Sequence, residues 1–213
     1  MSEAKSQTFF SSLPQLVMPV ITVPSVDAVH PMIDAIVAGG CQVLEITLRT
    51  AAGLKAIEYA RQAYPNAVVG AGSVLNPDHW DAAQAAGSQF MISPGATEAL
   101  YQKYASTQLP WLPGVANASD MMTALDYGCQ QVKFFPAMTL GGLSALRNYA
   151  SVFPQLQFCP TGGVKPEDAA QWLAEPMIFA VGGSWFTPTA LIKAQDWQAL
   201  QRHVEQCVTQ LPT

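Results

Sequence analysis

Short runs of apolar residues recur along the chain, and turns and amphipathic stretches separate them. Eight of these runs have the length and the glycine or proline boundaries that are typical of buried strands. They cover residues 16–23 (LVMPVITV), 42–47 (QVLEIT), 67–72 (AVVGAG), 89–93 (QFMIS), 110–115 (PWLPGV), 131–135 (QVKFF), 156–160 (LQFCP) and 178–183 (IFAVGG). The stretches between them, such as 26–40, 51–64 and 166–176, have the pattern of helices, and residues 194–211 predict a long final helix.

Three helix-to-strand junctions repeat one pattern, at residues 38–47 (AGGCQVLEIT), 85–93 (AAGSQFMIS) and 126–135 (DYGCQQVKFF). In each, a helix ends at a glycine, which suits the left-handed conformation that closes a helix. Such alternation predicts an α/β fold with a parallel sheet and helices outside it. Eight units favour a (β/α)8 TIM barrel in one compact domain over residues 1–213, with residues 1–14 as a short N-terminal helix or cap. A doubly wound open sheet is the alternative.

The composition is that of a globular chain with one large core, and it excludes several kinds of partner. Half of the 213 residues are hydrophobic and 12% are charged. The net charge of −5 and the lack of a basic run argue against binding to nucleic acid. Residues 1–15 lack the features of a signal peptide, and no apolar run is long enough to span a membrane. We therefore expect a cytoplasmic protein without a nucleic acid or membrane partner.

The cysteines and histidines are scattered rather than clustered. We interpret the four cysteines, which form no CxxC pair, as buried and reduced thiols: Cys41, Cys129, Cys159 and Cys207. The three histidines, His30, His79 and His203, are far apart and have no metal-ligand spacing. The sequence therefore predicts neither a metal site nor a metal cofactor.

Lys133 is unusual because it lies in an apolar strand-like run, between Val132 and two phenylalanines. Side chains alternate along a strand, so Lys133 shares a face with Phe135 and should point into the barrel. The same parity places Glu45 on the inward face of its strand and carries Arg49 towards the mouth. We therefore expect Lys133, Glu45 and Arg49 to share one pocket at the carboxyl ends of the strands, where barrels carry their chemistry.

Two interpretations of Lys133 remain open at this point. A structural Lys133–Glu45 ion pair is the simpler one, although buried ion pairs stabilise poorly compared with apolar packing. The other is a nucleophile, because desolvation favours the neutral amine, which can attack a ketone and form a Schiff base. Glu45 would then move the protons that this chemistry requires. Lys165, in GGVKPED, is better interpreted as a solvated loop lysine.

Other residues at the strand ends predict contacts with an anionic substrate. The planar guanidinium of Arg49 suits a carboxylate, and Ser73 could add a hydroxyl donor. Two glycine pairs, in TGG (161–163) and GGS (182–184), end the seventh and eighth runs. Barrels often bind phosphate after these strands, and glycine lets backbone N–H groups approach an oxyanion. Thr161 and Ser184 could donate hydroxyls there; two tight turns without a ligand are the alternative.

Several of these segments together resemble one enzyme family. EITLRT (45–50), VGAGSVLNP (69–77), ISPG (92–95), KFFPA (133–137), CPTGGV (159–164) and GGSW (182–185) resemble, in order and spacing, the bacterial 2-keto-3-deoxy-6-phosphogluconate aldolases, which also act as 4-hydroxy-2-oxoglutarate aldolases. The resemblance covers about residues 14–190. It implies a class I, metal-free lyase without a cofactor, in a homotrimeric (β/α)8 barrel of the Entner–Doudoroff pathway. Its substrate would be a phosphorylated 2-keto acid, cleaved to pyruvate and glyceraldehyde 3-phosphate.

The resemblance also implies roles for individual residues. Lys133 resembles the Schiff-base lysine and Glu45 the general acid/base, while Arg49 and the hydroxyl of Ser73 resemble the binders of the pyruvyl carboxylate. The remaining matches fall into two groups: Pro94 and Phe135 resemble pocket walls, and Thr161, Gly162, Gly163, Gly182, Gly183 and Ser184 resemble the groups that hold the distal hydroxyl and phosphate. The chain departs from the family pattern at Ser73, which is usually threonine, and at Met138-Thr139-Leu140, which is usually more polar.

Other functions compete with this one. A galactonate-series aldolase would use the C4 epimer with the same chemistry, but the resemblance favours the gluconate series, because galactonate-type enzymes carry an apolar residue in place of Thr161. A phosphosugar isomerase, or another phosphate-binding barrel, would not need a reactive Lys133. A non-catalytic metabolite-binding barrel would not need the set of Lys133, Glu45 and Arg49.

Overall fold

The computed structural model describes residues 9–107 and 109–210, and within them every strand pairing is parallel. The strands are β1 (Val17–Ile21), β2 (Val43–Thr47), β3 (Val68–Gly72), β4 (Met91–Ile92), β5 (Trp111–Leu112), β6 (Gly114–Val115), β7 (Gln131–Phe134), β8 (Gln157–Pro160) and β9 (Val181–Gly183). They form a six-stranded sheet, β5-β4-β3-β2-β1-β9, and a three-stranded sheet, β6-β7-β8.

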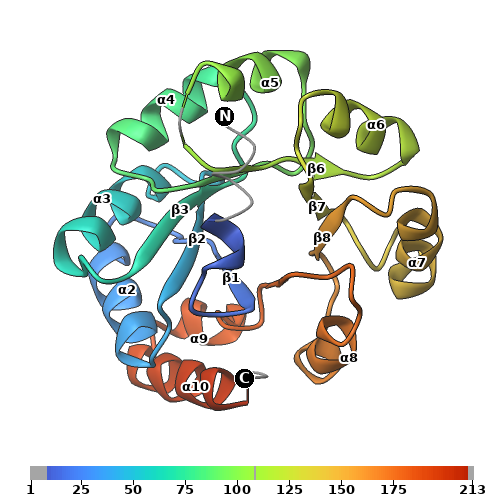
Figure 1. Cartoon of the computed structure of the whole chain (residues 1–213). Helices are drawn as coiled ribbons and strands as arrows, with labels where there is room; N and C mark the ends of the chain where they lie inside the picture. Colours follow the sequence, from blue (N-terminus) through green and yellow to red (C-terminus); the bar gives the residue numbers. More distant parts are fainter. Residues whose placement is uncertain (1–8, 108, 211–213) are drawn as a thin grey trace.

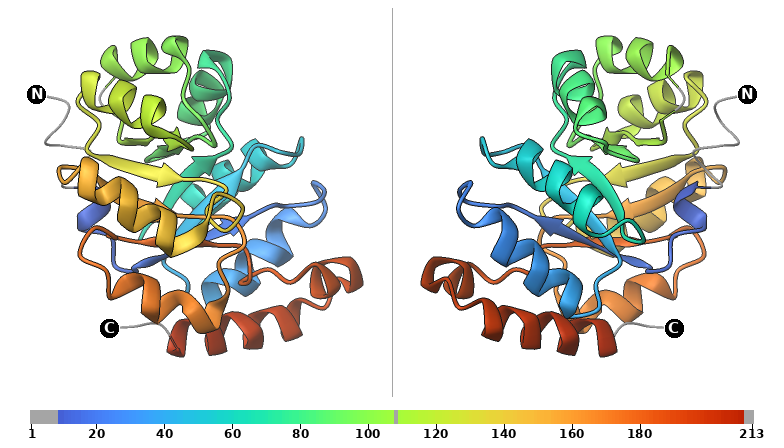
Figure 2. Two further views of the ribbon diagram at one scale, coloured as in Figure 1. Left: turned by 90° about the vertical axis from the view of Figure 1, so that its right-hand side faces the viewer. Right: turned by 90° about the vertical axis from the view of Figure 1, so that its left-hand side faces the viewer.

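The helices surround the strands in a ring, which Figure 1 shows along the strands and Figure 2 shows from the side. They are α2 (Val29–Ala38), α3 (Gly53–Ala63), α4 (Pro77–Ala85), α5 (Glu98–Ala105), α6 (Ala118–Asp126), α7 (Gly142–Val152), η1 (Pro166–Asp168), α8 (Ala169–Leu173), α9 (Thr189–Ala194) and α10 (Trp197–Thr209). The predicted long final helix is α10. The prediction of an α/β fold with a parallel sheet inside and helices outside is therefore confirmed, and the sheet is curled.

Each of the eight apolar runs contains a strand, but residues 110–115 contain two. Pro113 separates β5 from β6, and it cannot donate to a ladder because it has no N–H. Its carbonyl accepts the backbone N–H of Lys133 at 2.8 Å, so this segment joins the two sheets. At the other junction, Thr161 bridges to Gly182 and Phe158 to Ile178, both in parallel. The ladder is thus divided into two sheets, which meet at β5/β6 and again near β8 and β9.

The repeated helix-to-strand junctions have the backbone conformation that the sequence predicts. Gly40, Gly87 and Gly128 have φ values of 91°, 90° and 73°, in the left-handed region. A side chain at these positions would strain the backbone, so glycine closes each helix before the next strand starts.

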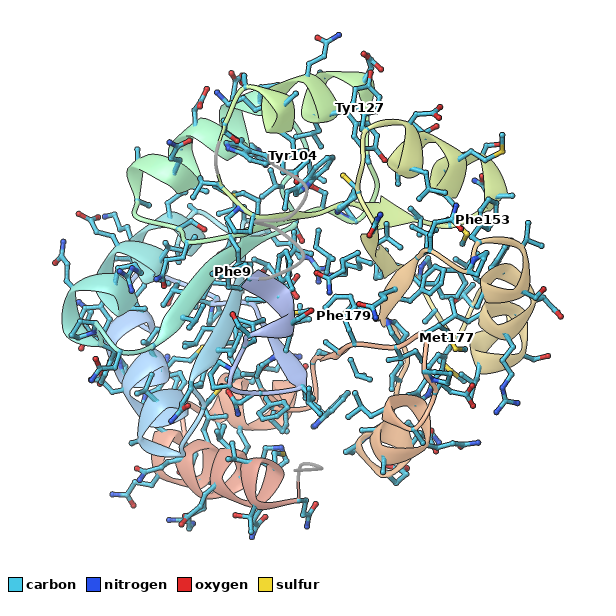
Figure 3. The ribbon with its side chains drawn as sticks, in the orientation of Figure 1. Phe9, Tyr104, Tyr127, Phe153, Met177 and Phe179 are labelled. Carbon is cyan, nitrogen blue, oxygen red and sulfur yellow. The ribbon has the colours of Figure 1, made fainter. Side chains whose placement is uncertain are left out.

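The core has two parts, because the strands have two apolar faces. One lies between the strands and the helices, and a smaller one fills the space inside the ring of strands. Residues 9–11 are helical, and the ring of Phe10 lies 5.7 Å from Phe90 and 6.4 Å from Phe179. Figure 3 shows Phe9 and Phe179 near the centre of the strand ring. This part of the expected N-terminal cap covers the amino ends of the strands, while residues 1–8 of it lie outside the described residues.

Candidate active site

A buried ion pair between Lys133 and Glu45 lies inside the ring of strands. Lys133 Nζ on β7 is 2.9 Å from Glu45 Oε1 on β2, and the two residues are 4% and 1% exposed. The strand parity therefore placed both side chains correctly on the inward face. At this separation a proton can pass between the amine and the carboxylate, or between either of them and a bound carbonyl compound.

The surroundings of this pair leave one carboxylate oxygen available. Glu45 Oε2 is buried and has no hydrogen-bond partner among the described residues. A Cβ on Gly72 would lie 2.5 Å from Glu45 Oε1, so only glycine leaves room for the carboxylate beside β3. Phe135 contributes its ring, whose centroid is 5.7 Å from Lys133 Nζ. A buried, unpaired acceptor normally finds a partner, which here could be a substrate hydroxyl or a water molecule.

Cys159 lies on the strand next to Lys133 and in register with it. Burial raises the pKa of the Cys159 thiol to about 12, although the positive charge of Lys133 acts in the opposite direction. The thiol is therefore protonated at neutral pH. Cys41 and Cys129 are buried too, and none of the four cysteines forms a disulfide, as the sequence predicts. The prediction of burial is wrong for Cys207, which is partly exposed on α10.

Arg49 and Ser73 meet at the carboxyl ends of β2 and β3. Arg49 Nε donates to Ser73 Oγ at 2.9 Å, and Ser73 has a left-handed φ of 58°. This is uncommon for a residue with a side chain and is often seen at functional sites. Arg49 is exposed and forms no ion pair within residues 9–107 and 109–210. Its remaining N–H groups can therefore receive a carboxylate.

The two glycine pairs lie side by side, because Thr161 bridges to Gly182. Gly162 and Gly163 form a left-handed turn with φ values of 97° and 80°. Gly182 and Gly183 belong to β9, and a Cβ on Gly182 would lie 2.1 Å from Thr161 Oγ1. The first pair thus forms a turn, whereas the second lets the Thr161 side chain pack against the neighbouring strand.

A pocket of about 370 Å³ brings Arg49 and Ser184 together. Ser184 follows β9 directly and is exposed. Thr22, Thr187 and Thr189 also line this pocket. Two residues that sequence reasoning assigned to opposite ends of a substrate thus line the same hollow.

The other residues singled out from the sequence lie outside the Lys133–Glu45 ion pair and the Arg49–Ser73 contact. Pro94 is half-buried, and its backbone packs against Gly114, the residue in register with Lys133. Lys165 is exposed, which agrees with a solvated lysine. Met138 is 47% exposed and donates its N–H to Gly162 O, so the unusual loop after KFFPA contacts the first glycine turn.

Sequence reasoning missed some residues that the structure brings to the site. Gly72 and Cys159 lie on strands next to the ion pair, and strand register, which a single sequence does not specify, puts them there. Thr22 follows β1 with the parity of Val20, so continuing the alternation past the strand end would have found it.

Within the described part of the chain no group of three or more His, Cys, Asp or Glu residues could hold a metal ion. None of the helices described is long and apolar enough to cross a bilayer.

A buried Lys–Glu pair inside a ring of parallel strands, with an arginine after the end of β2, is compatible with an α/β enzyme that acts on carbonyl compounds. Comparison with known proteins gives the family. Residues 13–203 match the family model described as KDPG and KHG aldolase, where the abbreviations denote 2-keto-3-deoxy-6-phosphogluconate and 4-hydroxy-2-oxoglutarate. The chain therefore belongs to the KDPG and KHG aldolase family.

Individual relatives agree with this assignment. A 2-dehydro-3-deoxy-phosphogluconate aldolase of Zymomonas mobilis is 49% identical over 172 residues, which cover 81% of this chain and 82% of the relative. A crystal structure of KDPG aldolase from Legionella pneumophila, with pyruvate captured as a covalent carbinolamine intermediate, has a TM-score of 0.87 and 36% identity, over 97% of this chain and 98% of that one. A Zymomonas mobilis aldolase structure with 3-phosphoglycerate has a TM-score of 0.83 and 44% identity, over 93% and 94% of the two chains.

Proposed function

We propose that this protein is a class I aldolase that cleaves 2-keto-3-deoxy-6-phosphogluconate to pyruvate and glyceraldehyde 3-phosphate, and that it also cleaves 4-hydroxy-2-oxoglutarate to pyruvate and glyoxylate. The observation that carries this proposal is the buried contact of 2.9 Å between Lys133 Nζ and Glu45 Oε1. Family membership and the covalent pyruvate adduct in the Legionella relative support it.

The reaction begins at the amine of Lys133. The neutral amine attacks the C2 ketone and forms a carbinolamine, and loss of water gives an iminium ion. Glu45 accepts the proton of the amine and returns a proton to the departing hydroxyl, because it lies within hydrogen-bond distance of Nζ. The ion pair in the free enzyme is thus the resting arrangement of the two groups that exchange protons during the reaction.

Carbon–carbon cleavage follows from the positive charge on the iminium nitrogen. Removal of the proton from the C4 hydroxyl releases the aldehyde, and the C3–C4 bonding electrons form an enamine. Protonation at C3 and hydrolysis then give pyruvate and free Lys133. The unpaired oxygen of Glu45 is the available base for these transfers among the described residues near the amine.

Both ends of the substrate contact residues at the carboxyl ends of the strands. Arg49 and Ser73 hold the carboxylate of the pyruvyl half. Thr161 contacts the distal hydroxyl, and Gly162, Gly163, Gly182, Gly183 and Ser184 form the distal hydroxyl and phosphate site. Pro94 and Phe135 form the walls. The relative that contains 3-phosphoglycerate supports a site for a three-carbon phosphate.

Reductive trapping tests the proposed nucleophile. Pyruvate with sodium borohydride should add one reduced pyruvyl group per chain, and peptide mapping should locate it on Lys133. Lys133→Met is the matched control, because it keeps a long side chain and removes the amine. Labelling at Lys165, or no labelling of the wild type at saturating pyruvate, would contradict the mechanism.

Further properties of the family are part of the same proposal. We infer one closed (β/α)8 barrel in a single domain over residues 1–213, a homotrimer, a cytoplasmic location in the Entner–Doudoroff pathway, and catalysis without a metal ion. The meeting of the two sheets at both of their edges supports the closed barrel. Light scattering tests the trimer. The enzyme should keep full activity after treatment with a chelator. Loss of activity with the chelator and its restoration by a metal ion would contradict catalysis without a metal.

The comparisons favour the gluconate series over the galactonate series, because the relatives reported above bear the gluconate name. The hydroxyl of Thr161 lies against Gly182 at the junction of β8 and β9, where it can distinguish the C4 epimers. Cleavage rates on the two epimers test this preference.

A further inference from the structure

A pair of threonine hydroxyls at the carboxyl ends of β1 and β2 has no part in the mechanism described so far. Thr22 Oγ1 and Thr47 Oγ1 are 2.8 Å apart. Thr47, the last residue of β2, is completely buried, whereas Thr22 is half-buried.

The position of this pair along the strands relates it to the site. Val20 is in register with Glu45, and each threonine lies two residues further along its strand. Alternation therefore directs Thr22 and Thr47 to the same interior face as Glu45, one layer nearer the mouth. Arg49 follows Thr47 by two residues, in the turn after β2. The hydroxyl pair thus lies between the proposed acid/base and the proposed carboxylate binder.

The burial of Thr47 decides which hydroxyl is free to donate. Each hydroxyl has one hydrogen, and the contact between them uses one of the two. Over residues 9–107 and 109–210, the Thr47 hydroxyl has Thr22 as its hydrogen-bond partner and no other. If Thr22 were the donor, the hydrogen of the buried Thr47 would have no acceptor, which is unfavourable. Thr47 therefore donates to Thr22, and the hydrogen of Thr22 points elsewhere.

The space beside Thr22 suits an anion. Thr22 lines the pocket of about 370 Å³ together with Arg49 and Ser184. Threonine hydroxyls and a guanidinium provide hydrogen-bond donors, and no carboxylate is among the lining residues. The apolar part of the lining includes Val20, the residue in register with Glu45. A group bound here would be held by hydrogen-bond donors at the end of the strand that pairs with the strand of Glu45.

We propose that Thr22 is a further substrate-binding residue, which donates a hydrogen bond to the carboxylate of the pyruvyl half beside Arg49. This inference rests on the proposed function. Thr47 orients the Thr22 hydroxyl and does not contact the substrate. Both substrates of the proposed reaction, and the product pyruvate, carry this carboxylate.

The test measures the pyruvate concentration that gives half-maximal borohydride trapping, together with KM and kcat for both substrates. Thr22→Val removes the hydroxyl and keeps the shape of the side chain, and Thr22→Ser keeps the hydroxyl. Loss of one hydrogen bond to a charged group should raise the half-maximal pyruvate concentration and both KM values roughly tenfold. Thr22→Ser should stay within about threefold of the wild type, and kcat should change less than KM in both variants.

Controls separate this role from a structural one and from the proposed function itself. Thr123→Val makes the same chemical change on the exposed face of α6 and should leave trapping unaltered. If wild-type Lys133 is trapped and Thr22→Val has an unchanged half-maximal concentration, only the role of Thr22 is wrong. The same holds if Thr22→Ser loses as much as Thr22→Val. If wild-type protein is not trapped at all, the proposed function fails and this inference fails with it.

Discussion

The ion pair between β2 and β7 and the glycine pairs near β8 and β9 lie in opposite physical surroundings. Lys133 and Glu45 are side chains removed from water, at 4% and 1% exposure, and their charges pair with each other. Ser184 and Gly163 are exposed and offer a hydroxyl and a backbone N–H group. A site closed to water keeps the two groups in direct contact, whereas an exposed site can exchange bound water for phosphate oxygens.

Under the proposed function, this difference separates the residues of the chemical steps from those of substrate binding. Contacts that exist only while bonds change affect kcat, and contacts that are equal in ground and transition states affect KM. Substitutions in the buried half should therefore lower kcat, and those in the glycine half should raise KM.

The largest effect is expected for Glu45→Gln. The amide has nearly the same shape, but it cannot accept and return protons. A general acid/base contributes about 10²–10⁴-fold, so kcat should fall by that factor. Circular dichroism and thermal unfolding should show a folded protein. An unfolded variant whose folded fraction keeps full activity would mean that Glu45 only partners Lys133.

A smaller effect, of the other kind, is expected for Ser184→Ala. The loss of one hydrogen bond to a charged group costs about 1.5–3 kcal/mol, so KM for the phosphorylated substrate should rise roughly ten- to hundredfold. KM for 4-hydroxy-2-oxoglutarate, which has no phosphate, should change much less. Steady-state kinetics on both substrates is the measurement. Equal losses on the two, or a loss confined to kcat, would place the phosphate elsewhere.

The buried half of the site was easier to predict from sequence than the exposed half. A charged residue within an apolar strand can point either to the helices or to the interior of the strand ring. Strand parity predicted the interior face for Lys133 and Glu45, and the distance of 2.9 Å between Lys133 Nζ and Glu45 Oε1 confirms this. Arg49 is long and exposed, and its partner Ser73 depends on a left-handed turn that no sequence pattern specified. The pocket shared by Arg49 and Ser184 depends on the adjacency of β9 and β1, which is a property of the folded sheet.

The fold shows the same division. Every apolar run contains a strand, because burial on two faces selects continuous apolar residues. The division at Pro113 into β5 and β6 was not predicted, although the proline stood in the run, because its effect depends on which neighbour each half pairs with. Hydrophobic patterns in a sequence therefore predict which segments are buried, but they do not predict which strands pair with each other.

Gly72→Ala tests how closely the buried half is packed. Its Cβ would lie 2.5 Å from Glu45 Oε1 and would force the carboxylate away from Lys133. Overpacking of a core costs about 1–3 kcal/mol, and we expect a stability loss in that range with kcat lowered roughly tenfold. Gly95→Ala is the matched control, because a Cβ there would have no atom within 4 Å. Similar results for the two variants would mean that β3 moves freely and does not position Glu45.

The smallest effect is expected at Cys159, which is as buried as the ion pair and lies in register with Lys133. Burial raises the pKa of its thiol to about 12, and Lys133 only partly opposes this shift. The thiolate is the nucleophilic form, so at pH 8 Cys159 should be almost entirely protonated and unreactive. Iodoacetamide at pH 8 should therefore leave Cys159 of the native protein unmodified and react first with the partly exposed Cys207.

Cys159→Ala should lower kcat by less than about threefold, while the small cavity costs some stability. Mass mapping of the alkylated protein, together with its residual activity, gives the answer. Fast alkylation of Cys159 with matching loss of activity would show that burial beside Lys133 is sufficient to recruit a residue to the chemistry. The expected inertness would show instead that the chemistry needs a charged partner at hydrogen-bond distance, which Glu45 has and Cys159 lacks.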